Sequence, residues 1–523
     1  MSIKGLICRG ARFLRRWQAA GYGEAKRRLR EEQEDSRIRQ ALRRPASLTE
    51  KERREQEKAV FPREIRFDLF FLKDSAGREP SAEMLRSIRE QTYGAYRIEP
   101  EAAAAAPEDY AVFLEKDAIL HPGALYECAK VISGTGAELL YADEDYFTER
   151  PGDRFQPRMK PDYGPDSLRG CNDAGPFLVC LRSLMKAAGA ERFAEQGEDA
   201  RWDLTLRMAG ETNRIAHIAK VLYYRHVPSG TEIPVPALRR INDPIGQEPL
   251  VSILIPNRDH RDDLKRCVDS IREKTDYPSY EILVLENNST EAETFRYYEE
   301  LRKDPWIRVI SREGAFNFSA LNNFGFREAK GAQILLLNND TEVIGGNWIR
   351  GMLMFAQRPD VGAVGAKLYY PDGTIQHAGI GIGIKIAAGH YHRGFPGNSR
   401  GYFGRLCYAQ DVSAVTAACM MIPRKVFEEM NGLDEGFSIV FNDIDLCLRI
   451  REAGYLIVWT PWAELIHYES KSRGPEGTTP EKKRFFVRET NRFLRRWHHV
   501  LEAGDPYYNP NLTRQKEDFS LRG

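Results

Sequence analysis

The feature that most limits how this 523-residue chain can fold is that it repeats itself. Four segments in its first half resemble four segments in its second half, in the same order. The pairs are LRSIREQTYGAYRI (85–98) with VDSIREKTDYPSYEI (268–282), YAVFLEKDAIL (110–120) with ILLLNNDTEVI (334–344), RWDLTLR (201–207) with DIDLCLR (443–449), and KVLYYRH (220–226) with AELIHYE (463–469). Such self-similarity indicates a duplicated fold. The architecture assigned to one half must therefore suit the other.

Changes in composition divide the chain into five parts. Residues 1–58 are highly charged and predict a helical extension, and residues 60–228 and 249–500 predict two globular domains. Residues 229–248 are rich in proline and predict a linker, and residues 501–523 predict a turn-rich tail.

Charge, cysteine content and hydropathy exclude several classes of protein. The 77 Lys and Arg nearly balance the 76 Asp and Glu, so no global positive field favours nucleic acid. The eight cysteines are scattered, which is typical of reduced thiols in a cytosolic protein. No apolar run approaches the roughly 18–20 residues that cross a bilayer, and the N-terminal residues are too charged for a signal peptide. We expect a cytoplasmic protein.

The second globular region alternates strands with helices. VSILIP (251–256), EILVLE (281–286) and WIRVIS (306–311) are short apolar runs of the kind found in buried parallel strands. Amphipathic segments such as DDLKRCVDSIREK (262–274) follow them. This alternation predicts a Rossmann-like α/β fold with a parallel sheet.

Polar residues follow the strands of this region. Asn338, Asn339 and Asp340 end a buried strand, and Asp443 and His467 come about a hundred residues later. Open α/β sheets bind ligands at the carboxyl ends of their strands. A metal-binding carboxylate, a second carboxylate fit to be a general base and a histidine together predict a metal-dependent transferase with a nucleotide-activated donor.

Motifs along nearly the whole of 249–500 resemble glycosyltransferase family 2, whose members are inverting enzymes of the GT-A fold. The resemblance is greatest to bacterial rhamnosyl- and galactosyltransferases that build O-antigens and other cell-surface polysaccharides. The matching segments, in order, are FNFSALNNFGF, LLLNNDTEV, VGAVGAKLYYPDGTIQHAG, SAVTAACMM, FNDIDLCLRIREAGY and ELIHYESKSRG.

The resemblance assigns roles to individual residues. Asp340, at the last position of the family's DxD motif, and His467 are implied to bind Mg²⁺ or Mn²⁺, and Asp443 to be the catalytic base. Asn338 replaces the first Asp of the motif, and Asn442 precedes Asp443 where the family has Glu. The residues implied to bind the nucleotide are Pro256, Asn257, Glu286, Asn288, Asn323 and Asn338.

The function implied is transfer of a sugar from a nucleotide-sugar donor, linked to dTDP or UDP, to a glycan or polyprenyl-linked acceptor of a bacterial surface polysaccharide. The alternative is a non-catalytic carbohydrate-binding or scaffold subunit of a polysaccharide synthase complex. A nucleotidyltransferase would normally show a Gly-rich, Lys-containing loop after the first strand, and PNRDHRDD (256–263) has neither feature.

The first globular region resembles the second but lacks its chemistry, so we expect two GT-A domains in tandem, the first degenerate. In the repeat, Arg201 stands at the place of Asp443 and Tyr224 at the place of His467. Asp203 matches Asp445, which therefore reads as scaffold. The segment YADEDYF (141–147) resembles a second acidic motif, but we expect a solvated acidic loop there.

Basic segments near both ends leave two interpretations open. KKRFFVRETNRFLRRWHHVL (482–501) places Phe, Leu and Trp among Arg and Lys at helical spacing. Such a helix either lies on the anionic inner face of the cell membrane or packs on the second domain with a solvated basic face.

Overall fold

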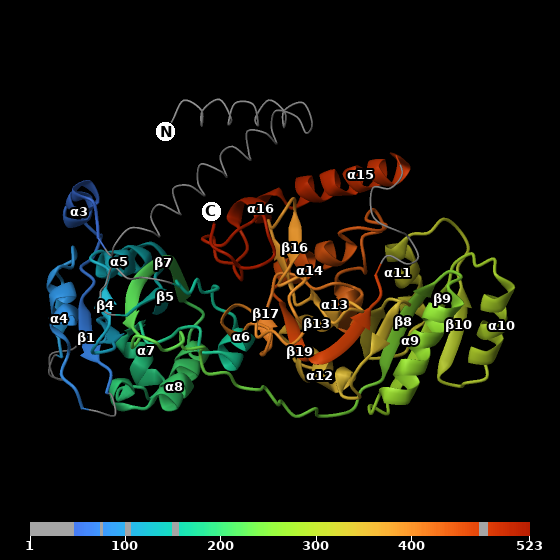
Figure 1. Ribbon diagram of the computed structural model, residues 1–523, viewed down its shortest axis with the longest axis horizontal. Helices are drawn as coiled ribbons and strands as arrows, with labels where there is room; N and C mark the ends of the chain where they lie inside the picture. Colours follow the sequence, from blue (N-terminus) through green and yellow to red (C-terminus); the bar gives the residue numbers. More distant parts are fainter. Residues whose placement is uncertain (1–46, 74–76, 100–105, 149–155, 470–479, 523) are drawn as a thin grey trace.

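The computed structural model of the protein describes residues 47–73, 77–99, 106–148, 156–469 and 480–522. Its strands form two large sheets covered by helices, which confirms the predicted α/β class (Figure 1). The sheets are not wholly parallel as predicted, because each contains antiparallel as well as parallel pairs of strands. Most of the extension predicted at residues 1–58 lies outside the described residues. In the part that is described, helix α3 (Glu50–Glu57) begins at a capping box formed by Thr49 and Glu52. None of the helices in the described ranges is both long and apolar enough to cross a membrane.

The first unit, residues 60–228, contains a seven-stranded sheet in the order β2-β1-β3-β6-β5-β7-β4. Its strands are β1 (Phe67–Phe71), β2 (Tyr96–Ile98), β3 (Tyr110–Leu114), β4 (Ile119–Leu120), β5 (Leu139–Phe147), β6 (Leu178–Leu181) and β7 (Ile215–His226). Its helices are α4 (Ala82–Arg89), α5 (Ala124–Thr135), α6 (Pro165–Gly170), α7 (Arg182–Ala187), η2 (Phe193–Glu195) and α8 (Glu198–Gly210).

The second unit, residues 249–500, contains a ten-stranded sheet whose main path is β10-β9-β8-β11-β18-β13-β19-β12. These strands are β8 (Val251–Asn257), β9 (Tyr280–Glu286), β10 (Ile307–Ser311), β11 (Gln333–Leu337), β12 (Thr341–Val343), β13 (Val361–Tyr369), β18 (Cys419–Pro423) and β19 (Leu456–His467). Strand β14 (Ile375–His377) pairs with β13 and β17 (Gln410–Asp411) with β19, while β15 (Ile380–Ile382) and β16 (Ala388–His390) form a separate hairpin. The helices are α9 (Arg261–Lys274), α10 (Ala292–Leu301), α11 (Phe318–Glu328), α12 (Trp348–Ala356), η3 (Tyr402–Gly404), α13 (Arg424–Glu429), α14 (Asn442–Glu452), α15 (Pro480–Arg496) and α16 (His498–Ala503).

The two sheets share one topology. The order β2-β1-β3-β6-β5-β7-β4 corresponds strand by strand to β9-β8-β11-β18-β13-β19-β12. Each pair of neighbouring strands in the first sheet has the same relative direction, parallel or antiparallel, as the corresponding pair in the second sheet. The second unit adds β10 at its edge, together with α10 and α11 between β9 and β11. This agreement supports the duplication that the sequence repeat predicts.

The parallel part of the second sheet determines where the site lies. Strands β8, β9 and β11 run parallel as neighbours, so their carboxyl ends meet at one edge. All seven residues of β8 and all five of β11 are buried, as expected for strands covered by helices on both faces. The polar residues that follow these strands are therefore held on a rigid sheet.

A polar joint connects the units. Ser167 of α6 donates its backbone N–H to Asp411 Oδ2 (2.9 Å), and Asp411 donates its own N–H to Ser167 Oγ (3.0 Å). Arg358 of the second unit lies 2.5 Å from Asp166 Oδ1 of the first. Gly164 has no room for a side chain, since a Cβ there would lie 2.4 Å from Asp411 Oδ2. The contact therefore requires glycine at this position.

The C-terminal segment, residues 504–522, contacts both units. On the first unit, Asn509 donates to Asp143 (3.0 Å) and to the carbonyl of Lys160 (2.8 Å). On the second, Glu517 accepts from the backbone N–H of His390 in β16 (2.9 Å), and Phe519 stacks on His392. The segment thus connects the first unit to the β15–β16 hairpin.

Candidate functional site

Asp340 and His467 lie side by side at the end of the sheet. Residues 338–340 follow β11, and His467 is the last residue of β19, which pairs with β12 so that Thr341 lies opposite His467. Asp340 Oδ1 is 3.1 Å from His467 Nε2, and both residues are only 7% exposed. The structure thus brings together two residues that are more than a hundred positions apart in the chain.

The contacts of His467 show what this pair can bind. Its Nδ1 lies 2.7 Å from Gln376 Oε1, and its Nε2 lies 3.3 Å from Asn338 Nδ2. An ionised Asp340 can only accept, so it and an unprotonated Nε2 need a positive charge between them, either a proton or a metal ion. One carboxylate, one imidazole and an adjacent amide suit Mn²⁺ or Mg²⁺. Among the described residues, no group of three or more His, Cys, Asp or Glu side chains forms a complete metal site.

Asp443 lies in the first turn of α14 and is held by backbone donors. Its carboxylate accepts from the N–H of Ala417 (3.1 Å) and of Ile444 (2.8 Å). Burial raises the pKa of the Asp443 carboxyl above its usual value, although these N–H donors oppose the rise. A carboxylate with a raised pKa accepts a proton more readily than an exposed one.

One turn links Asp443 to the end of β11. Ala417 donates to Asp443, and the next residue, Ala418, accepts a hydrogen bond from Asn338 N–H (3.1 Å) through its carbonyl. The carboxylate of Asp443 and the backbone of Asn338 are therefore bonded to consecutive residues of one turn. This connection links Asp443 to the strand end that also carries Asp340.

The predicted nucleotide residues at the ends of β8 and β9 form a buried network. Pro256 and Asn257 are the last two residues of β8, and Glu286 is the last of β9. Asn339 Nδ2 donates to Asn257 Oδ1 (2.6 Å), and the amide nitrogen of Asn257, Nδ2, donates to Tyr298 Oη (2.8 Å). Glu286 accepts from Tyr298 Oη and from Ser289 N–H and Oγ. Its carboxylate is thus engaged within the protein, and it fixes the loop that follows β9.

Asn288 and Asn323 have different surroundings. Asn288 is exposed in the loop after β9, has a φ of 59° and donates to the carbonyl of Gly314 (2.6 Å). Asn323 lies in α11, where it donates to the carbonyl of Leu433 (2.9 Å) and accepts from Leu433 N–H (2.9 Å). It therefore ties α11 to the loop before α14.

In the first unit, an ion pair occupies the corresponding sheet end. Glu115, one residue after β3, accepts from Arg225 Nε (2.9 Å) and Nη2 (2.8 Å). Tyr224, which pairs with Ile119 of β4, occupies the strand position equivalent to His467. Arg201 donates to the carbonyl of Gln196 (2.5 Å). The guanidinium of Arg225 thus lies against the Glu115 carboxylate, at the sheet end where the second unit has the His467 imidazole near Asp340.

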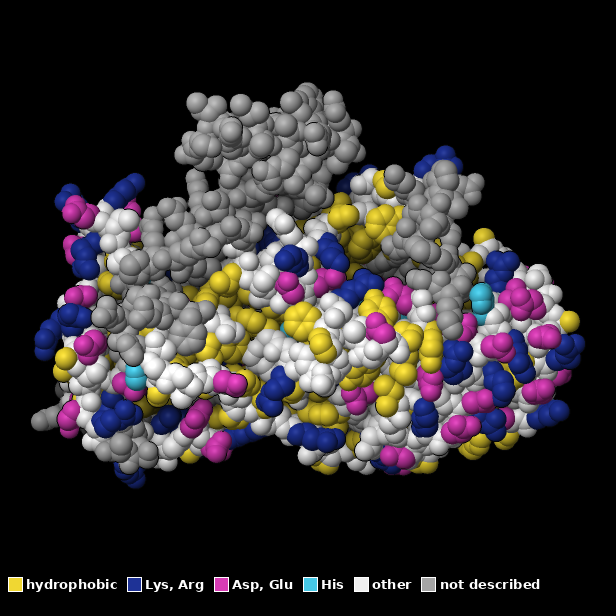
Figure 2. Space-filling view, viewed as in Figure 1, with side chains coloured by type: hydrophobic (Ala, Val, Ile, Leu, Met, Phe, Trp, Pro, Cys, Tyr) yellow, Lys and Arg dark blue, Asp and Glu magenta, His cyan; other side chains and the backbone are white. Residues whose placement is uncertain are grey.

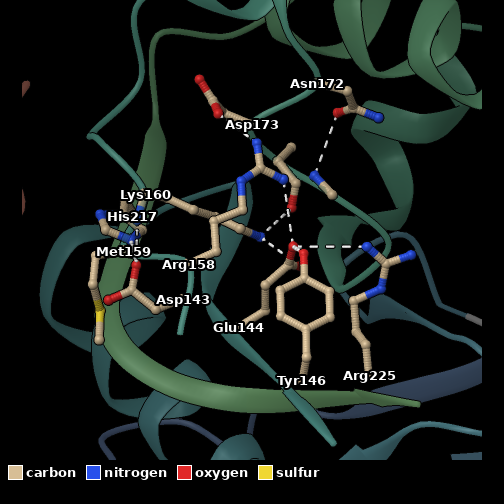
Figure 3. A network of polar contacts seen from close by, with 12 residues as sticks. Asp143, Glu144, Tyr146, Arg158, Met159, Lys160, Asn172, Asp173, His217 and Arg225 are labelled. Carbon is tan, nitrogen blue, oxygen red and sulfur yellow. Dashed lines mark hydrogen bonds and ion pairs between the residues drawn. The ribbon is translucent and has the colours of Figure 1, made fainter. Parts of the chain in front are cut away.

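The expectation of a solvated acidic loop at YADEDYF is wrong. These residues belong to β5, all nine of whose residues are buried. Figure 3 shows Asp143, Glu144 and Tyr146 of this strand together with Arg158, Lys160 and Arg225. Burial opposes ionisation of Glu144, but Lys160, Arg225 and Arg158 hold its pKa well below the usual range. Because these cations lie outside β5, two of them in the segment that follows it and Arg225 in β7, the strand's own sequence did not show that the acidic charge is compensated.

Three features of the site were not predicted. Gln376 contacts His467, the turn at 416–418 connects Asp443 to Asn338, and Glu489 of α15 holds the loop before α14. Glu489 accepts from Ser438 N–H (2.7 Å), Ser438 Oγ (2.8 Å) and Val440 N–H (2.8 Å). Each role depends on a contact between distant segments. The resemblance offered a signal for two of them, since TIQHAG and SAVTAACMM are matching motifs with no assigned role.

Comparison with known proteins relates the second unit to one family. Residues 252–430 match the model of glycosyl transferase family 2. The chain is 40% identical over 489 residues to "Uncharacterized protein y4gI" of Sinorhizobium fredii (strain NBRC 101917 / NGR234), covering 86% of this chain and 53% of that protein. It is 34% identical over 485 residues to "O-antigen biosynthesis protein RfbC" of Myxococcus xanthus, covering 86% of this chain and 37% of that protein. The chain thus spans about half of the first relative and just over a third of the second.

Two further similarities are weaker. Over 149 residues the chain is 28% identical to "N-acetylglucosaminyl-diphospho-decaprenol L-rhamnosyltransferase" of Mycobacterium tuberculosis (strain CDC 1551 / Oshkosh), covering 27% of this chain and 48% of that protein. A solved mannosyltransferase, PcManGT from Pyrobaculum calidifontis in complex with GDP-Man and Mn²⁺, aligns with a TM-score of 0.36 and 16% identity, over 49% of this chain and 68% of that one. The family model confirms the resemblance seen in the sequence. The second unit therefore contains a glycosyl transferase family 2 domain at residues 252–430.

Proposed function

We propose that the protein transfers a sugar, with inversion, from a dTDP- or UDP-linked donor to a glycan or polyprenyl-linked acceptor of a bacterial surface polysaccharide. One observation carries this proposal: Asp340 and His467 lie 3.1 Å apart at a sheet end, and the turn at 416–418 connects that end to Asp443. The similarity to a protein named for O-antigen biosynthesis supports the acceptor class.

Asp340 and His467 would hold Mg²⁺ or Mn²⁺, with Asn338 beside them. Such an ion, when bound, neutralises the negative charge that grows on the leaving diphosphate. The protein's own contribution is to keep both ligands on paired strands. Because the strands are buried and rigid, little reorganisation is needed when the donor binds.

Asp443 would act as the general base. The acceptor hydroxyl oxygen forms a bond to the anomeric carbon while the bond from that carbon to the diphosphate oxygen breaks. The hydroxyl proton passes to the carboxylate of Asp443, and the nucleoside diphosphate leaves. A single displacement of this kind inverts the anomeric configuration and needs no covalent intermediate.

The ends of β8, β9 and β11 would bind the nucleotide. Pro256, Asn257 and Asn338 belong to this edge, and Asn288 lies exposed in the loop that follows β9. Glu286 and Asn323 would contribute through the loops that they hold in place.

We infer that the first unit is a degenerate copy of the same domain. The ion pair between Arg225 and Glu115 puts a fixed cation at the end of β3, where a second positive ion would be repelled. The shared strand order supports descent from one fold.

We also propose that the protein works in the cytoplasm, in contact with the inner face of the cell membrane through α15. Arg484, Arg488 and Arg495 are exposed on one face of this helix, and Val487 is 48% exposed beside them. Figure 2 shows basic and hydrophobic side chains close together in this part of the surface. Positive charge with exposed apolar groups is typical of helices that lie on anionic membranes.

The test of the proposed activity is thermal unfolding of the full chain with UDP, dTDP, GDP or CDP, each with and without Mn²⁺. A ligand at 100 times its dissociation constant should add about 2.7 kcal/mol to the free energy of unfolding. We expect a Mn²⁺-dependent shift with one nucleotide, and His467→Ala should require more Mn²⁺ for the same shift. If no nucleotide shifts the transition, the scaffold interpretation is favoured instead.

A further inference from the structure

Gln376 is a buried side chain with three polar contacts beside the proposed metal site. It lies in β14 and is 4% exposed. Its Oε1 is 2.7 Å from His467 Nδ1. Its Nε2 donates to the main-chain carbonyl of His467 (3.4 Å) and to Glu469 Oε2 (3.1 Å).

These contacts permit only one orientation of the amide. Both neighbours of Gln376 Nε2 are oxygen acceptors, and an amide nitrogen can only donate to them. If the amide were reversed, its oxygen would face two other oxygens and two hydrogen bonds would be lost. Gln376 Oε1 therefore faces His467, and because this oxygen can only accept, Nδ1 of the ring must carry a proton.

The protonation of Nδ1 determines what Nε2 offers. In a neutral imidazole only one nitrogen carries hydrogen, so Nε2 then presents a lone pair toward Asp340 and Asn338. This is the form that can ligate a metal ion. The opposite tautomer would direct an N–H at Asp340, and the two residues would satisfy each other without any ion.

We propose that Gln376 is a positioning residue that holds His467 in its Nδ1-protonated tautomer and thereby prepares Nε2 for the metal. This inference rests on the metal site of the proposed function and adds to it the residue that prepares the site. Hydrogen bonds from the second nitrogen of a ligating histidine commonly fix its orientation, and their loss lowers metal affinity about 10–100-fold.

The variants for the test are Gln376→Met and Gln376→Glu. Methionine keeps the length of the side chain but removes both the acceptor and the donor. Glutamate keeps an oxygen acceptor opposite Nδ1. Gln333→Met is the matched control, because Gln333 is also buried but lies at the other end of β11, where it donates to the carbonyl of Ala356.

The first measurement is binding of Mn²⁺ to the full chain, followed by electron paramagnetic resonance. We expect Gln376→Met to raise the dissociation constant about 10–100-fold. Gln376→Glu should raise it less than Gln376→Met does, because it keeps the acceptor opposite Nδ1 but loses the two bonds donated by Nε2. Gln333→Met should stay within about threefold of the wild type. Equal Mn²⁺ affinity in Gln376→Met and the wild type would overturn the inference.

The second measurement needs no metal and no activity. ¹⁵N-histidine labelling of the metal-free protein reports which ring nitrogen carries hydrogen, and the His467 signals are assigned by their loss in His467→Asn. The wild type should show Nδ1–H, and Gln376→Met should lose this preference. An unchanged tautomer in Gln376→Met would overturn the inference. If the tautomer changes but the wild type binds no Mn²⁺, Gln376 still positions His467 and the metal-dependent function fails.

Discussion

Asp443 and Asp445 lie two positions apart in the first turn of α14, yet their carboxylates have different hydrogen-bond partners. Asp445 is fully buried and accepts from Arg449 Nε (2.9 Å) and Trp497 Nε1 (3.0 Å). Asp443 is held by the backbone N–H groups of Ile444 and of Ala417, which lies in the turn before β18. The Asp445 carboxylate therefore fastens the residue that follows α15 to α14, and the Asp443 carboxylate is bonded to the turn at 416–418.

This difference gives a prediction at the scale of single residues. Asp443→Asn should lower kcat about 10²–10⁴-fold, because an amide cannot accept the acceptor's proton, while nucleotide binding is retained. Since burial raises the pKa of Asp443, activity should also be lost on acidification at a higher pH than for an exposed aspartate. Steady-state kinetics across pH check both points.

Asp445→Asn is the matched control for this substitution. It should lower the melting temperature, because it weakens the bonds to Arg449 and Trp497, and affect kcat less than Asp443→Asn does. Wild-type turnover in Asp443→Asn would exclude this residue as the base.

At the residue scale, the sequence supplied candidates but not their contacts. The strand that ends at Asn338 predicted a polar cluster at a sheet edge, and the resemblance added His467. The repeat suggested that Asp445 is scaffold, as its burial now shows, although Asp203 at the matching position is exposed and pairs with Arg239. The role of Gln376 could not be predicted, because it depends on β14 folding back beside β19.

At the scale of elements, α15 has two faces with different partners. Its buried face carries Phe493 and Glu489, and Glu489 holds the loop before α14. Its exposed face carries Arg484, Arg488 and Arg495, whereas Arg492 is paired with Asp434. The periodicity of the sequence predicted this amphipathic helix. Its buried face packs on the second unit, as one interpretation expected, and membrane contact through its exposed face stays a prediction.

The exposed face of α15 can be tested with vesicles. The full chain should float with vesicles that contain phosphatidylglycerol but not with neutral phosphatidylcholine vesicles. Changing Arg484, Arg488 and Arg495 together to Glu should cost at least about 3 kcal/mol, roughly a hundredfold in affinity, at about 1 kcal/mol for each cation lost. Changing them to Lys should preserve binding. Equal flotation of the Glu variant and the wild type would contradict membrane contact through this face.

The sequence predicted the strands and helices better where they are apolar than where they are charged. The runs VSILIP and ILLL became β8 and β11 because burial on both faces favours continuous apolar residues. YADEDYF also became a buried strand, but its stability depends on Arg158, Lys160 and Arg225. Local patterns could not reveal partners that the fold supplies from elsewhere.

At the scale of the whole molecule, polar contacts across long sequence separations hold the two units together. Asn509 of the C-terminal segment donates to Asp143, and Asp143 also contacts His217 Nε2 (2.9 Å) in β7. The repeat predicted two similar units, but it could not predict this joint, because each contact joins residues that occur once. Ser167 and Asp411, for example, are hydrogen-bonded to each other across the two units.

The part of the joint that is built on Asp143, which contacts both Asn509 and His217, should weaken at alkaline pH. Burial alone would lower the pKa of His217, but Asp143 and Asp162 outweigh it and raise the pKa to about 9. A raised pKa means that this contribution to stability is complete below about pH 6.5 and is lost as pH rises through about 9. The shift corresponds to roughly 3 kcal/mol. Urea unfolding at pH 6 and pH 9.5 measures the loss.

His217→Gln should show a smaller decrease between these two pH values than the wild type. His226→Gln is the control, because His226 lies near the exposed end of β7 and is 3.7 Å from Asp117. If His217→Gln and the wild type lose the same free energy of unfolding, the charged His217 does not stabilise the joint.

The turn at residues 416–418 has a consequence for how such a protein can change. Ala417 bonds to Asp443, and Ala418 bonds to Asn338. A shift of this turn would therefore move Asp443 and the end of β11 at the same time. Selection for a new sugar donor would then disturb Asp443, the proposed general base. Selection for a new acceptor would disturb the ends of β8, β9 and β11, where we propose that the nucleotide binds. In a library of random variants, we expect substitutions at 416–418 to recur as compensating changes, since few other positions restore both contacts together.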